Sequence, residues 1–461
     1  MKTKKINYVY KTEPYDHQKD VLEVSWAARY WALFLEMGTG KSKIICDTIG
    51  MLYEREEINA VLILAPKGVF DNWVKGEIPT HLPDRIERNV LRWTPSKTKA
   101  FQEKLRAITY EDSEDLKIFV MNIEAFSSAR GTKAAQTFLN SNPDNIVVVD
   151  ESTTIKNRKA ARTKNIVDLE ELSKYRRILT GSPVTKSPMD LFSQCLFLSP
   201  RALGFNSFFA FQGRYAMVQR RTMGHRSFQE IVGYRRLDEL NEKLLTFSSR
   251  ILKEDCLDLP PRIYVRREVE LTDEQAKLYT QMKRLALAQL NNGELATTSS
   301  VLTQIMRLQQ ICCGFLQPDE GPIEPLPNNR LSGLMSAIDE TQGKVIIWAS
   351  YTYDIQRITS ALRDRFGPEA VATYYGATPQ DERQDIIEKF QDVNSELRFF
   401  VGQPKTGGFG ITLHAASTMI YFSNSYDLEI RLQSESRAHR INQTKSVTYI
   451  DLVSPNTIDE K

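Results

Sequence analysis

A glycine-rich pentapeptide, GTGKS at residues 38–42, follows an apolar segment and precedes a segment with helical periodicity. Because glycine has no side chain, backbone N–H groups in such a turn can approach phosphate oxygens closely. Lys41 is spaced to reach the β- and γ-phosphates of a nucleotide, and the Ser42 hydroxyl is spaced to bind Mg²⁺. A full phosphate loop would have glycine in place of Leu35, so a plain strand-to-helix turn remains an alternative. We favour nucleotide binding because both flanking elements are predicted.

Two adjacent carboxylates, Asp150 and Glu151, end a second apolar run at residues 146–149. In a nucleotide-hydrolysing enzyme the first would hold magnesium, and the second would orient and deprotonate water. An acidic pair at the end of a strand is common, so it is informative only together with the glycine-rich turn. The separation from Lys41 suits two strands of one sheet.

Arg437 and Arg440 lie three residues apart in the sequence QSESRAHR at 433–440. If the segment is helical, both lie on one face, where two guanidinium groups can neutralise charge on a transferred phosphoryl group. For this segment alone, a surface helix that makes salt bridges is the better interpretation. His439 between them fits packing or hydrogen bonding better than a role as catalytic base.

Short β-rich apolar segments recur along the chain, each followed by a segment compatible with a helix. They occupy residues 31–35, 60–65, 117–121, 145–149, 177–179, 344–349, 370–374, 397–401, 418–422 and 447–452. This alternation predicts an α/β fold with two parallel-sheet lobes. Two helices, at about 272–291 and 299–313, and a proline-containing loop at 317–329 are expected between them. The expected domains are lobe 1 at 1–200, a basic insertion at 201–258, a bridge at 259–335 and lobe 2 at 336–461.

The basic insertion begins with a segment, residues 201–237, that has seven arginines and one acidic residue, although the whole chain carries a formal charge of only +3. The arginines are Arg201, Arg214, Arg220, Arg221, Arg226, Arg235 and Arg236. Such a segment fits a phosphate-binding surface or, equally, a solvated face. Residues 216–221 and 226–232 predict a β-hairpin around 222–225. It would contact duplex DNA or part its strands, or would be a structural flap; we favour DNA contact. The aromatic side chains Phe205, Phe208, Phe209 and Phe211 are expected to form a small core, not a base-stacking platform.

The composition of the 461-residue chain, with 41% hydrophobic and 26% charged residues, is that of a globular protein. It excludes disordered, collagen-like and small disulfide-rich classes. No stretch approaches the roughly 18 apolar residues of a membrane helix, and no apolar run follows the basic start. The five cysteines, Cys46, Cys195, Cys256, Cys312 and Cys313, form no C-x-x-C pair, which argues against zinc and for a reducing compartment. We therefore expect a cytoplasmic protein, with Cys312 and Cys313 in a core.

Taken in order, these segments resemble the motifs of superfamily-two helicases, and more narrowly the Swi/Snf-type DNA translocases. In lobe 1, similar motifs occur at 15–18 (YDHQ), 37–42, 65–67, 150–157 and 179–183, and the motif at 65–67 is followed by Asn72, Trp73 and Glu77. In lobe 2, similar motifs occur at 407–413 and 433–443. The bridge sequences LPP at 259–261 and RLQQIC at 307–312 are typical of the narrower group. The resemblance covers residues 15–461.

The resemblance implies two RecA-like lobes, with ATP and Mg²⁺ as cofactors. Implied catalytic residues are Lys41, Asp150, Glu151, Arg437 and Arg440, with Ser42 and Asp150 at the metal. Implied nucleotide-binding residues are Gln18, which would read the adenine, Gly38, Thr39, Gly40, Lys41, Ser42, Gly410 and Gln433. Expected DNA contacts are Lys67, Thr180, Thr412 and five arginines of the insertion, Arg220, Arg221, Arg226, Arg235 and Arg236.

The implied function is an ATP-dependent DNA translocase that unwinds or branch-migrates forked and junction DNA. The compact chain is most similar to phage-encoded or fork-remodelling members, which act in replication, recombination and repair. We expect a monomer, in a bacterial cell or an infected host, that works with replication or recombination proteins. Alternatives are a duplex translocase that displaces bound proteins, an RNA helicase, which the bridge disfavours, and a non-catalytic DNA-binding partner, which the intact motifs disfavour.

Three positions depart from the family pattern. The second motif reads DEST at 150–153, so the usual histidine that links it to other motifs is missing. Thr412 stands where asparagine is usual in the expected DNA contact. Residues 457–461 resemble the start of the family's closing helix, which is consistent with a truncated sequence.

Overall fold

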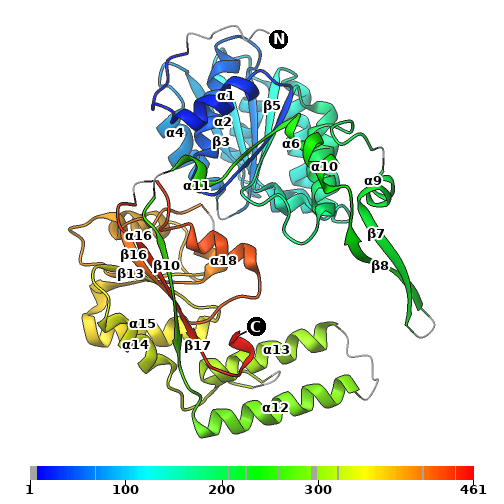
Figure 1. Cartoon of the computed structure of the whole chain (residues 1–461). Helices are drawn as coiled ribbons and strands as arrows, with labels where there is room; N and C mark the ends of the chain where they lie inside the picture. Colours follow the sequence, from blue (N-terminus) through cyan, green and yellow to red (C-terminus); the bar gives the residue numbers. More distant parts are fainter. Residues whose placement is uncertain are drawn as a thin grey trace. The chain divides into compact units, whose positions relative to one another are not determined.

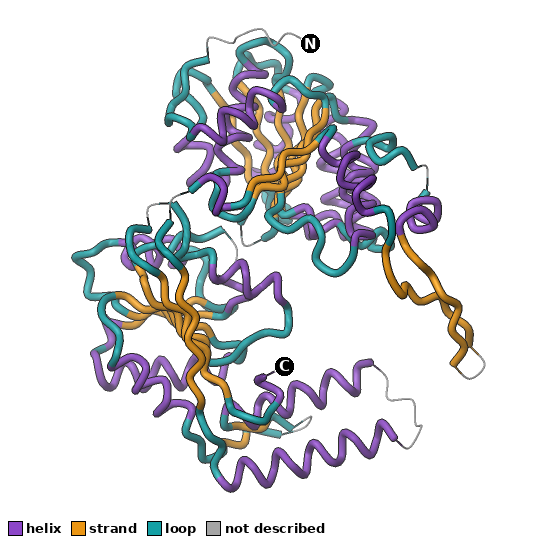
Figure 2. Tube along the Cα trace, in the orientation of Figure 1, coloured by secondary structure: helices purple, strands orange, loops and turns teal. Residues whose placement is uncertain are grey.

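The chain divides into two compact units, Met1–Asp258 (unit 1) and Leu259–Lys461 (unit 2). The computed structural model describes residues 8–67, 69–205, 207–223, 226–257, 259–291, 298–318, 321–407, 410–441 and 443–460. Figures 1 and 2 show each unit as a twisted sheet with helices packed on it.

Over its described residues, unit 1 has a seven-stranded parallel sheet in the order β3-β4-β2-β5-β6-β1-β9. The strands are β1 (Tyr30–Leu35), β2 (Ala60–Ala65), β3 (Arg88–Arg92), β4 (Leu116–Asn122), β5 (Asn145–Asp150), β6 (Tyr175–Leu179) and β9 (Ser248–Ile251). The central strands β2 and β5 are buried at every position. Parallel sheets covered on both faces need such continuous apolar strands, which is why the sequence predicts them well.

Helices cover this sheet, and those between residues 99 and 245 bury apolar side chains with it in one continuous core. The longer helices of unit 1 are α1 (Asp16–Ser25), α2 (Lys41–Tyr53), α5 (Lys99–Tyr110), α6 (Ala129–Ser141), α7 (Ala161–Val167), α8 (Leu191–Leu198), α9 (Phe208–Tyr215) and α10 (Leu237–Leu245), and the short α11 (Lys253–Cys256) follows β9. The shorter elements between β2 and β3 are α3 (Phe70–Asn72), a π-helix (Trp73–Glu77) and α4 (Ile78–His81).

An antiparallel hairpin of β7 (Ala216–Met223) and β8 (Arg226–Tyr234) extends from α9 away from the sheet of unit 1 (Figure 1). The strands run further than the sequence predicts, since Thr222 and Met223 belong to β7, while Gly224 and His225 of the expected turn lie outside the described residues. At the base of the hairpin Phe211 is fully buried in the unit 1 core, and Phe205 and Phe208 are packed against that core. The prediction of a small aromatic core is confirmed for these three, but is wrong for the 67%-exposed Phe209.

Unit 2 has, over the part that the structure describes, a six-stranded parallel sheet in the order β10-β17-β16-β13-β15-β14. The strands are β10 (Arg262–Glu268), β13 (Lys344–Trp348), β14 (Val371–Tyr374), β15 (Phe399–Gly402), β16 (Ala416–Tyr421) and β17 (Val447–Val453). The helices are α12 (Asp273–Asn291), α13 (Thr298–Cys313), α14 (Arg330–Asp339), α15 (Thr352–Phe366), α16 (Glu382–Gln391), α17 (Pro404–Gly407) and α18 (Leu428–Glu435). The prediction of an α/β fold with two RecA-like parallel-sheet lobes is confirmed.

The helices α12 and α13 lie side by side and project from unit 2 (Figures 1 and 2). A small core of Tyr279, Leu308, Ile311 and Cys312 joins them near the sheet end. Cys312 and Cys313 are buried, as expected from the apolar helix. All five cysteines are free thiols.

Three strands of the two parallel sheets were not predicted from the sequence. β9 lies within the range expected for the insertion and pairs with β1, so that range contributes to the sheet of unit 1. β10 lies within the expected bridge and pairs with β17. β3, β9 and β10 are sheet edges, and each carries at least one arginine. β10, with the sequence RIYVRRE at 262–268, is exposed at nearly every position, and β3 and β9 each have only one buried residue. Edge strands lack the apolar run that marks a buried parallel strand.

No helix among the described residues is long and apolar enough to cross a membrane.

Candidate nucleotide site

The glycine-rich turn leads from the carboxyl end of β1 into the first turn of α2. Gly38 and Gly40 have φ values of 84° and 90°, a left-handed conformation that favours glycine. The Lys41 ammonium is held at this strand end, where it donates to the Leu35 carbonyl at 2.9 Å. Thr39 is fully buried, and its hydroxyl donates to the Glu36 carbonyl at 2.7 Å. The turn is therefore a rigid loop that presents Lys41 and Ser42 at the strand end.

Helix α1 packs against this turn through Gln18. The Gln18 amide donates to the Thr39 carbonyl at 3.0 Å, and its carbonyl oxygen accepts from the Tyr15 backbone N–H at 3.1 Å. A Cβ atom at Gly40 would lie 2.0 Å from Gln18 Nε2, so only glycine leaves room for this contact. Gln18 is 2% exposed, and in this structure its side chain holds the turn.

Asp150 lies at the carboxyl end of β5 and is almost fully buried, with 7% exposure. Its Oδ2 accepts from the Trp73 indole N–H at 2.9 Å, and its Oδ1 accepts from the Glu151 backbone N–H at 2.9 Å. Burial raises the pKa of Asp150, whereas the Trp73 hydrogen bond and the nearby Lys41 charge act in the opposite direction. The structure thus brings Lys41 and Asp150 together, as the sequence predicts for two strands of one sheet.

The oxygens of Ser42 and Asp150 are the kind of hard ligands that Mg²⁺ prefers. Over the described part of the chain, no group of three or more His, Cys, Asp and Glu residues forms a metal cage. Magnesium bound with nucleotide phosphates usually takes only one or two protein ligands. The residues present therefore fit a magnesium ion that arrives with a nucleotide.

Glu151 follows Asp150 with a left-handed backbone, φ 48° and ψ 57°. A non-glycine residue in this conformation is strained by about 1–2 kcal/mol, and such strain is often found at functional sites. The next residue, Ser152, donates its hydroxyl to Gln194 Oε1 at 2.7 Å, and Gln194 Nε2 donates to the Pro183 carbonyl at 2.8 Å. Ser152 and Gln194 therefore link the acidic motif to the segment 179–183, although the usual histidine is missing.

In unit 2, Arg437 and Arg440 do not share a helix, because α18 ends at Glu435. The expectation of one helical face was wrong, and the two residues lie in the irregular turn that follows. Their guanidinium groups nevertheless converge, since both Nη1 atoms donate to the Ile411 carbonyl, at 3.1 and 3.2 Å. Arg437 is only 7% exposed, which argues against a surface helix.

Neighbouring groups fix this arginine pair. Arg437 Nε donates to the Gln433 carbonyl at 2.8 Å, and Arg440 Nη1 donates to the Thr412 hydroxyl at 2.7 Å. The Gln433 side chain is fully buried, and Gly410 nearby in sequence takes a left-handed φ of 69°. His439 forms a 2.8 Å hydrogen bond with the Pro260 carbonyl, in agreement with a packing role. Gly408 and Phe409, within the predicted 407–413 motif, lie outside the described residues, as do Asn442 and Lys461.

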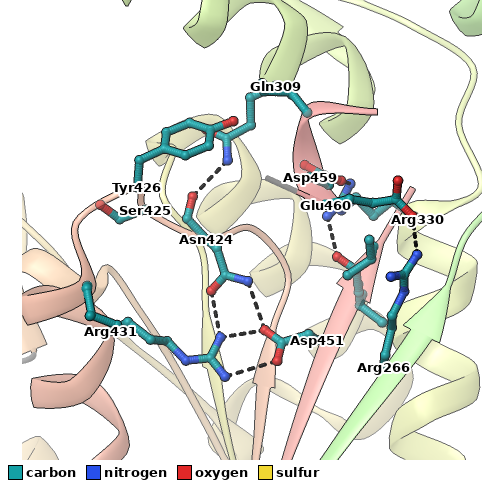
Figure 3. Close-up of a pocket in the computed structure, with 14 residues that line it drawn as sticks. Arg266, Gln309, Arg330, Asn424, Ser425, Tyr426, Arg431, Asp451, Asp459 and Glu460 are labelled. Atoms are coloured by element: carbon teal, nitrogen blue, oxygen red, sulfur yellow. Dashed lines mark hydrogen bonds and ion pairs between the residues drawn. The ribbon is translucent and has the colours of Figure 1, made fainter. Parts of the chain in front are cut away.

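Unit 2 also has a polar pocket of about 450 Å³ beside the carboxyl ends of β16 and β17 (Figure 3). Each arginine that lines it pairs with an acidic side chain, as Arg431 does with Asp451 and Arg330 with Asp459. Asn424 donates to Asp451 at 2.8 Å and accepts from Arg431 at 2.8 Å. Because these charges are balanced inside the protein, the pocket is a structural junction and not a phosphate site.

Comparison with known proteins places this geometry in a family. The sequence matches the SNF2-related domain over residues 17–315 and the helicase conserved C-terminal domain over residues 329–442. The chain belongs to the SNF2-related family. The two matches together place it among the SNF2-type ATPases of helicase superfamily two.

Several curated relatives are known for this SNF2-related chain. It is 25% identical, over 92% of its length, to the SWI/SNF chromatin-remodeling complex subunit snf22 of Schizosaccharomyces pombe, and covers 25% of that protein. It is 25% identical, over 94% of its length, to the putative ATP-dependent helicase/translocase YwqA of Bacillus subtilis, and covers 46% of it. The chain thus spans about a quarter to a half of the length of the relatives it matches. A solved SWI2/SNF2 ATPase core of Sulfolobus solfataricus in complex with dsDNA is 23% identical, with a TM-score of 0.45 over 98% of this chain and 90% of that one.

The residues expected to contact DNA fall into different environments. Lys67 is exposed after β2, and Arg220, Arg235 and Arg236 are exposed in and beside the hairpin. Thr180 is 1% exposed, and its hydroxyl accepts from the Ser182 backbone N–H at 3.1 Å. The Thr180 side chain thus holds a buried turn in this structure, and its contact with DNA stays a prediction.

Some arginines of the insertion are partly neutralised. Arg221 pairs with Glu230 across the hairpin, and Arg214 pairs with Glu239 at 2.5 Å. Arg220 Nη2 donates to the Ser227 hydroxyl at 3.0 Å, and Arg235 Nη2 donates to the Gly213 carbonyl at 2.6 Å. These pairs are exposed, where salt bridges contribute little, so an incoming phosphate can compete for the arginines.

Three residues at the site of unit 1 have roles that the sequence did not predict. Trp73 contacts Asp150, Gln194 connects two motifs, and Arg177 donates to the Ser25 and Trp26 carbonyls at 2.8 and 3.0 Å. Arg177 is fully buried and satisfies the carbonyl groups at the C-terminal end of α1. It therefore fixes the helix that positions Gln18 at the turn. An arginine inside an apolar strand was the only sequence signal for this role.

Proposed function

We propose that this SNF2-related chain is an ATP-dependent DNA translocase. The observation that carries the proposal is the meeting of Lys41 and the buried Asp150 at the carboxyl edge of the unit 1 sheet. The turn at 38–42 would hold the phosphates through its N–H groups, with Lys41 at the β- and γ-phosphates. Ser42 and Asp150 would hold Mg²⁺, which neutralises phosphate charge when bound. Glu151 would orient and deprotonate the attacking water.

Unit 2 would complete the reaction through Arg437 and Arg440. Both guanidinium groups already converge on the Ile411 carbonyl, so they are pre-oriented as a pair. Charge-assisted contacts from two arginines stabilise charge that develops on a transferred phosphoryl group. If the two units close on ATP, hydrolysis is coupled to their opening and closing, which is a step of movement along DNA. Gln18, Gly410 and Gln433 are proposed to line the nucleotide.

The proposed substrate is DNA with a fork or junction, held mainly through its phosphates, so that movement is largely independent of sequence. Lys67, with Thr412 in unit 2, would contact the tracked duplex. The hairpin β7–β8, with exposed Arg220 and Arg221, would contact the branch. Its projection from the body of unit 1 suits a wedge or clamp at a junction (Figure 1). Replication or recombination proteins are the partners that this activity would imply.

A second candidate is translocation along duplex DNA that displaces bound proteins without separating the strands. The relatives favour it, because they include a subunit of a chromatin-remodeling complex and a helicase/translocase. The two candidates share the ATP site. They differ in whether movement along DNA unwinds or branch-migrates it, or displaces bound proteins without separating the strands.

ATP hydrolysis measured with single-stranded, duplex, forked and four-way DNA, and with RNA, tests the proposal. We expect DNA-stimulated hydrolysis that is abolished in Lys41→Ala; Glu151→Gln should still bind ATP without turnover. Lys99→Ala, an exposed lysine on α5, is the matched control and should keep wild-type rates. Normal hydrolysis by Lys41→Ala or Glu151→Gln would refute the assigned site.

Two displacement assays then separate the candidates. Release of a labelled strand from forks or four-way junctions supports unwinding or branch migration. Release of streptavidin from biotinylated duplex without strand release supports the second candidate. Stimulation by RNA alone would refute both.

A further inference from the structure

The contact between Trp73 and Asp150 joins two side chains that are both removed from solvent. Trp73 is 0% exposed and donates its indole N–H to Asp150 Oδ2 at 2.9 Å. The other oxygen of the carboxylate, Oδ1, accepts from the Glu151 backbone N–H at 2.9 Å. With one donor on each oxygen, the plane of the carboxylate is fixed before any ligand arrives.

The backbone that carries Trp73 has an unusual geometry. Residues Trp73–Glu77 form a π-helix between α3 and α4, and its closing bond runs from the Ile78 N–H to the Trp73 carbonyl. A π-helix is rare, and one inside an α-helical stretch is frequently found at a functional site. It changes the direction of the side chains by about one residue relative to an α-helix, which here accompanies the inward orientation of the indole.

Three residues of the sequence NWVKGE, at 72–77, stabilise this turn. Residues five apart face each other in a π-helix, and Asn72 Nδ2 donates to Glu77 Oε1 at 2.9 Å over that spacing. A Cβ atom at Gly76 would lie 2.7 Å from Asn72 Oδ1, so glycine makes room for the Asn72 side chain. The Cys46 thiol contacts the Glu77 carbonyl at 3.7 Å and ties the turn to α2, the helix that follows Lys41.

From these contacts we propose that Trp73 is a positioning residue for the magnesium-binding carboxylate of Asp150. The inference rests on the proposed function, because it assumes that Asp150 holds the magnesium of bound ATP. The indole N–H stabilises the ionised carboxylate in its buried position and directs its remaining lone pairs toward the glycine-rich turn. Residues that orient a metal ligand from behind typically contribute 10–100-fold to metal affinity or activity.

The test measures binding of a fluorescent ATP analogue to the full chain in MgCl₂ and in EDTA, with no turnover needed. For the wild type we expect tighter binding in MgCl₂. Trp73→Phe keeps an aromatic ring but removes the donor, so we expect the Mg²⁺-dependent gain in affinity to fall about 10-fold or more, with binding in EDTA unchanged within twofold. The matched control is Trp93→Phe, which removes the same atoms from another buried tryptophan of unit 1, one that packs against Phe101 and Phe119.

A second variant tests the same inference if Trp73→Phe does not fold. Asn72→Ala removes the bond to Glu77 from a half-buried position and leaves Trp73 in place. Loss of one hydrogen bond predicts a smaller decrease of the Mg²⁺-dependent gain, about two- to tenfold.

The outcomes distinguish this inference from the proposed function. A wild-type chain that binds no nucleotide overturns both. If the wild type binds nucleotide, and the Mg²⁺-dependent gain in affinity is the same in the wild type, Trp73→Phe and Asn72→Ala, the inference alone is overturned. A loss of affinity in Trp73→Phe that is equal in EDTA and MgCl₂ also overturns it, because it indicates a general defect of the site.

Discussion

Replacing Arg330 by methionine should destabilise unit 2 strongly. The Arg330 side chain is 1% exposed, and its guanidinium group joins α14 to the ends of two strands. It donates to the Phe422 carbonyl at 2.7 Å and to the Leu452 carbonyl at 2.6 Å. It also pairs at 2.6 Å with Asp459, whose side chain is 5% exposed (Figure 3). Methionine fills much of the volume but satisfies none of these oxygens.

The magnitude follows from what remains after the substitution. Removing one partner of a buried ion pair usually costs about 3–5 kcal/mol, because the other charge is left uncompensated. Asp459 keeps one donor, the Ser454 backbone N–H at 3.2 Å, so we expect the lower end, about 3 kcal/mol. Adding Asp459→Asn removes the unpaired charge and should reduce the loss to about 1–2 kcal/mol, which is the cost of the unsatisfied carbonyls.

The assay must report on unit 2 alone, because two units need not unfold together. Of the five tryptophans only Trp348 belongs to unit 2, and it is fully buried in that core. Labelling with 5-fluorotryptophan and following the Trp348 ¹⁹F resonance in urea therefore isolates the transition of unit 2. A loss of about 3 kcal/mol lowers the urea midpoint by about 1–2 M at a slope near 2–3 kcal/mol per M.

The matched control removes an arginine from an exposed pair in the same unit. Arg365 on α15 pairs with Asp339 on α14 at 2.7 Å, with side chains 44% and 52% exposed. Arg365→Met should cost no more than about 1 kcal/mol, since exposed salt bridges contribute little. Equal midpoints for Arg330→Met and Arg365→Met would refute the reasoning, as would a double variant less stable than Arg330→Met alone.

Two further predictions concern function. Arg437→Ala and Arg440→Ala should each reduce ATP turnover about 10³-fold while nucleotide binding is retained, as for arginines that act on the transferred phosphoryl group; unchanged turnover in both would remove them from the site. Replacing Arg220, Arg221 and Arg226 together by glutamine should weaken DNA binding and flatten its salt dependence, by about 0.9 in the log–log slope for each DNA phosphate that is no longer neutralised. Equal slopes for variant and wild type would leave the hairpin as a structural flap.

The buried part of the fold could be predicted from the sequence because burial on both faces leaves a continuous apolar run. Strands such as β2 and β5 carry that signal, and the chemistry at 38–42 and 150–151 follows directly from their ends. The edge strands β3 and β10 gave no such signal, since only one residue of β3, Leu91, is buried, and β10 is exposed at nearly every position. Their pairing depends on the neighbouring strand and not on their own composition.

The arginine pair shows why spacing alone does not determine a site. A separation of three residues suggested a shared helical face, yet Arg437 and Arg440 lie in a turn and meet only because both reach the Ile411 carbonyl from a distant segment. The same holds for Asp150, whose partner Trp73 is 77 residues away and oriented by a π-helix that no periodicity indicates. The functional residues could therefore be predicted from the sequence where they directly follow an apolar strand. Contacts between such segments depend on tertiary packing, so the positioning roles, that of Trp73 toward Asp150 above all, emerged only from the structure.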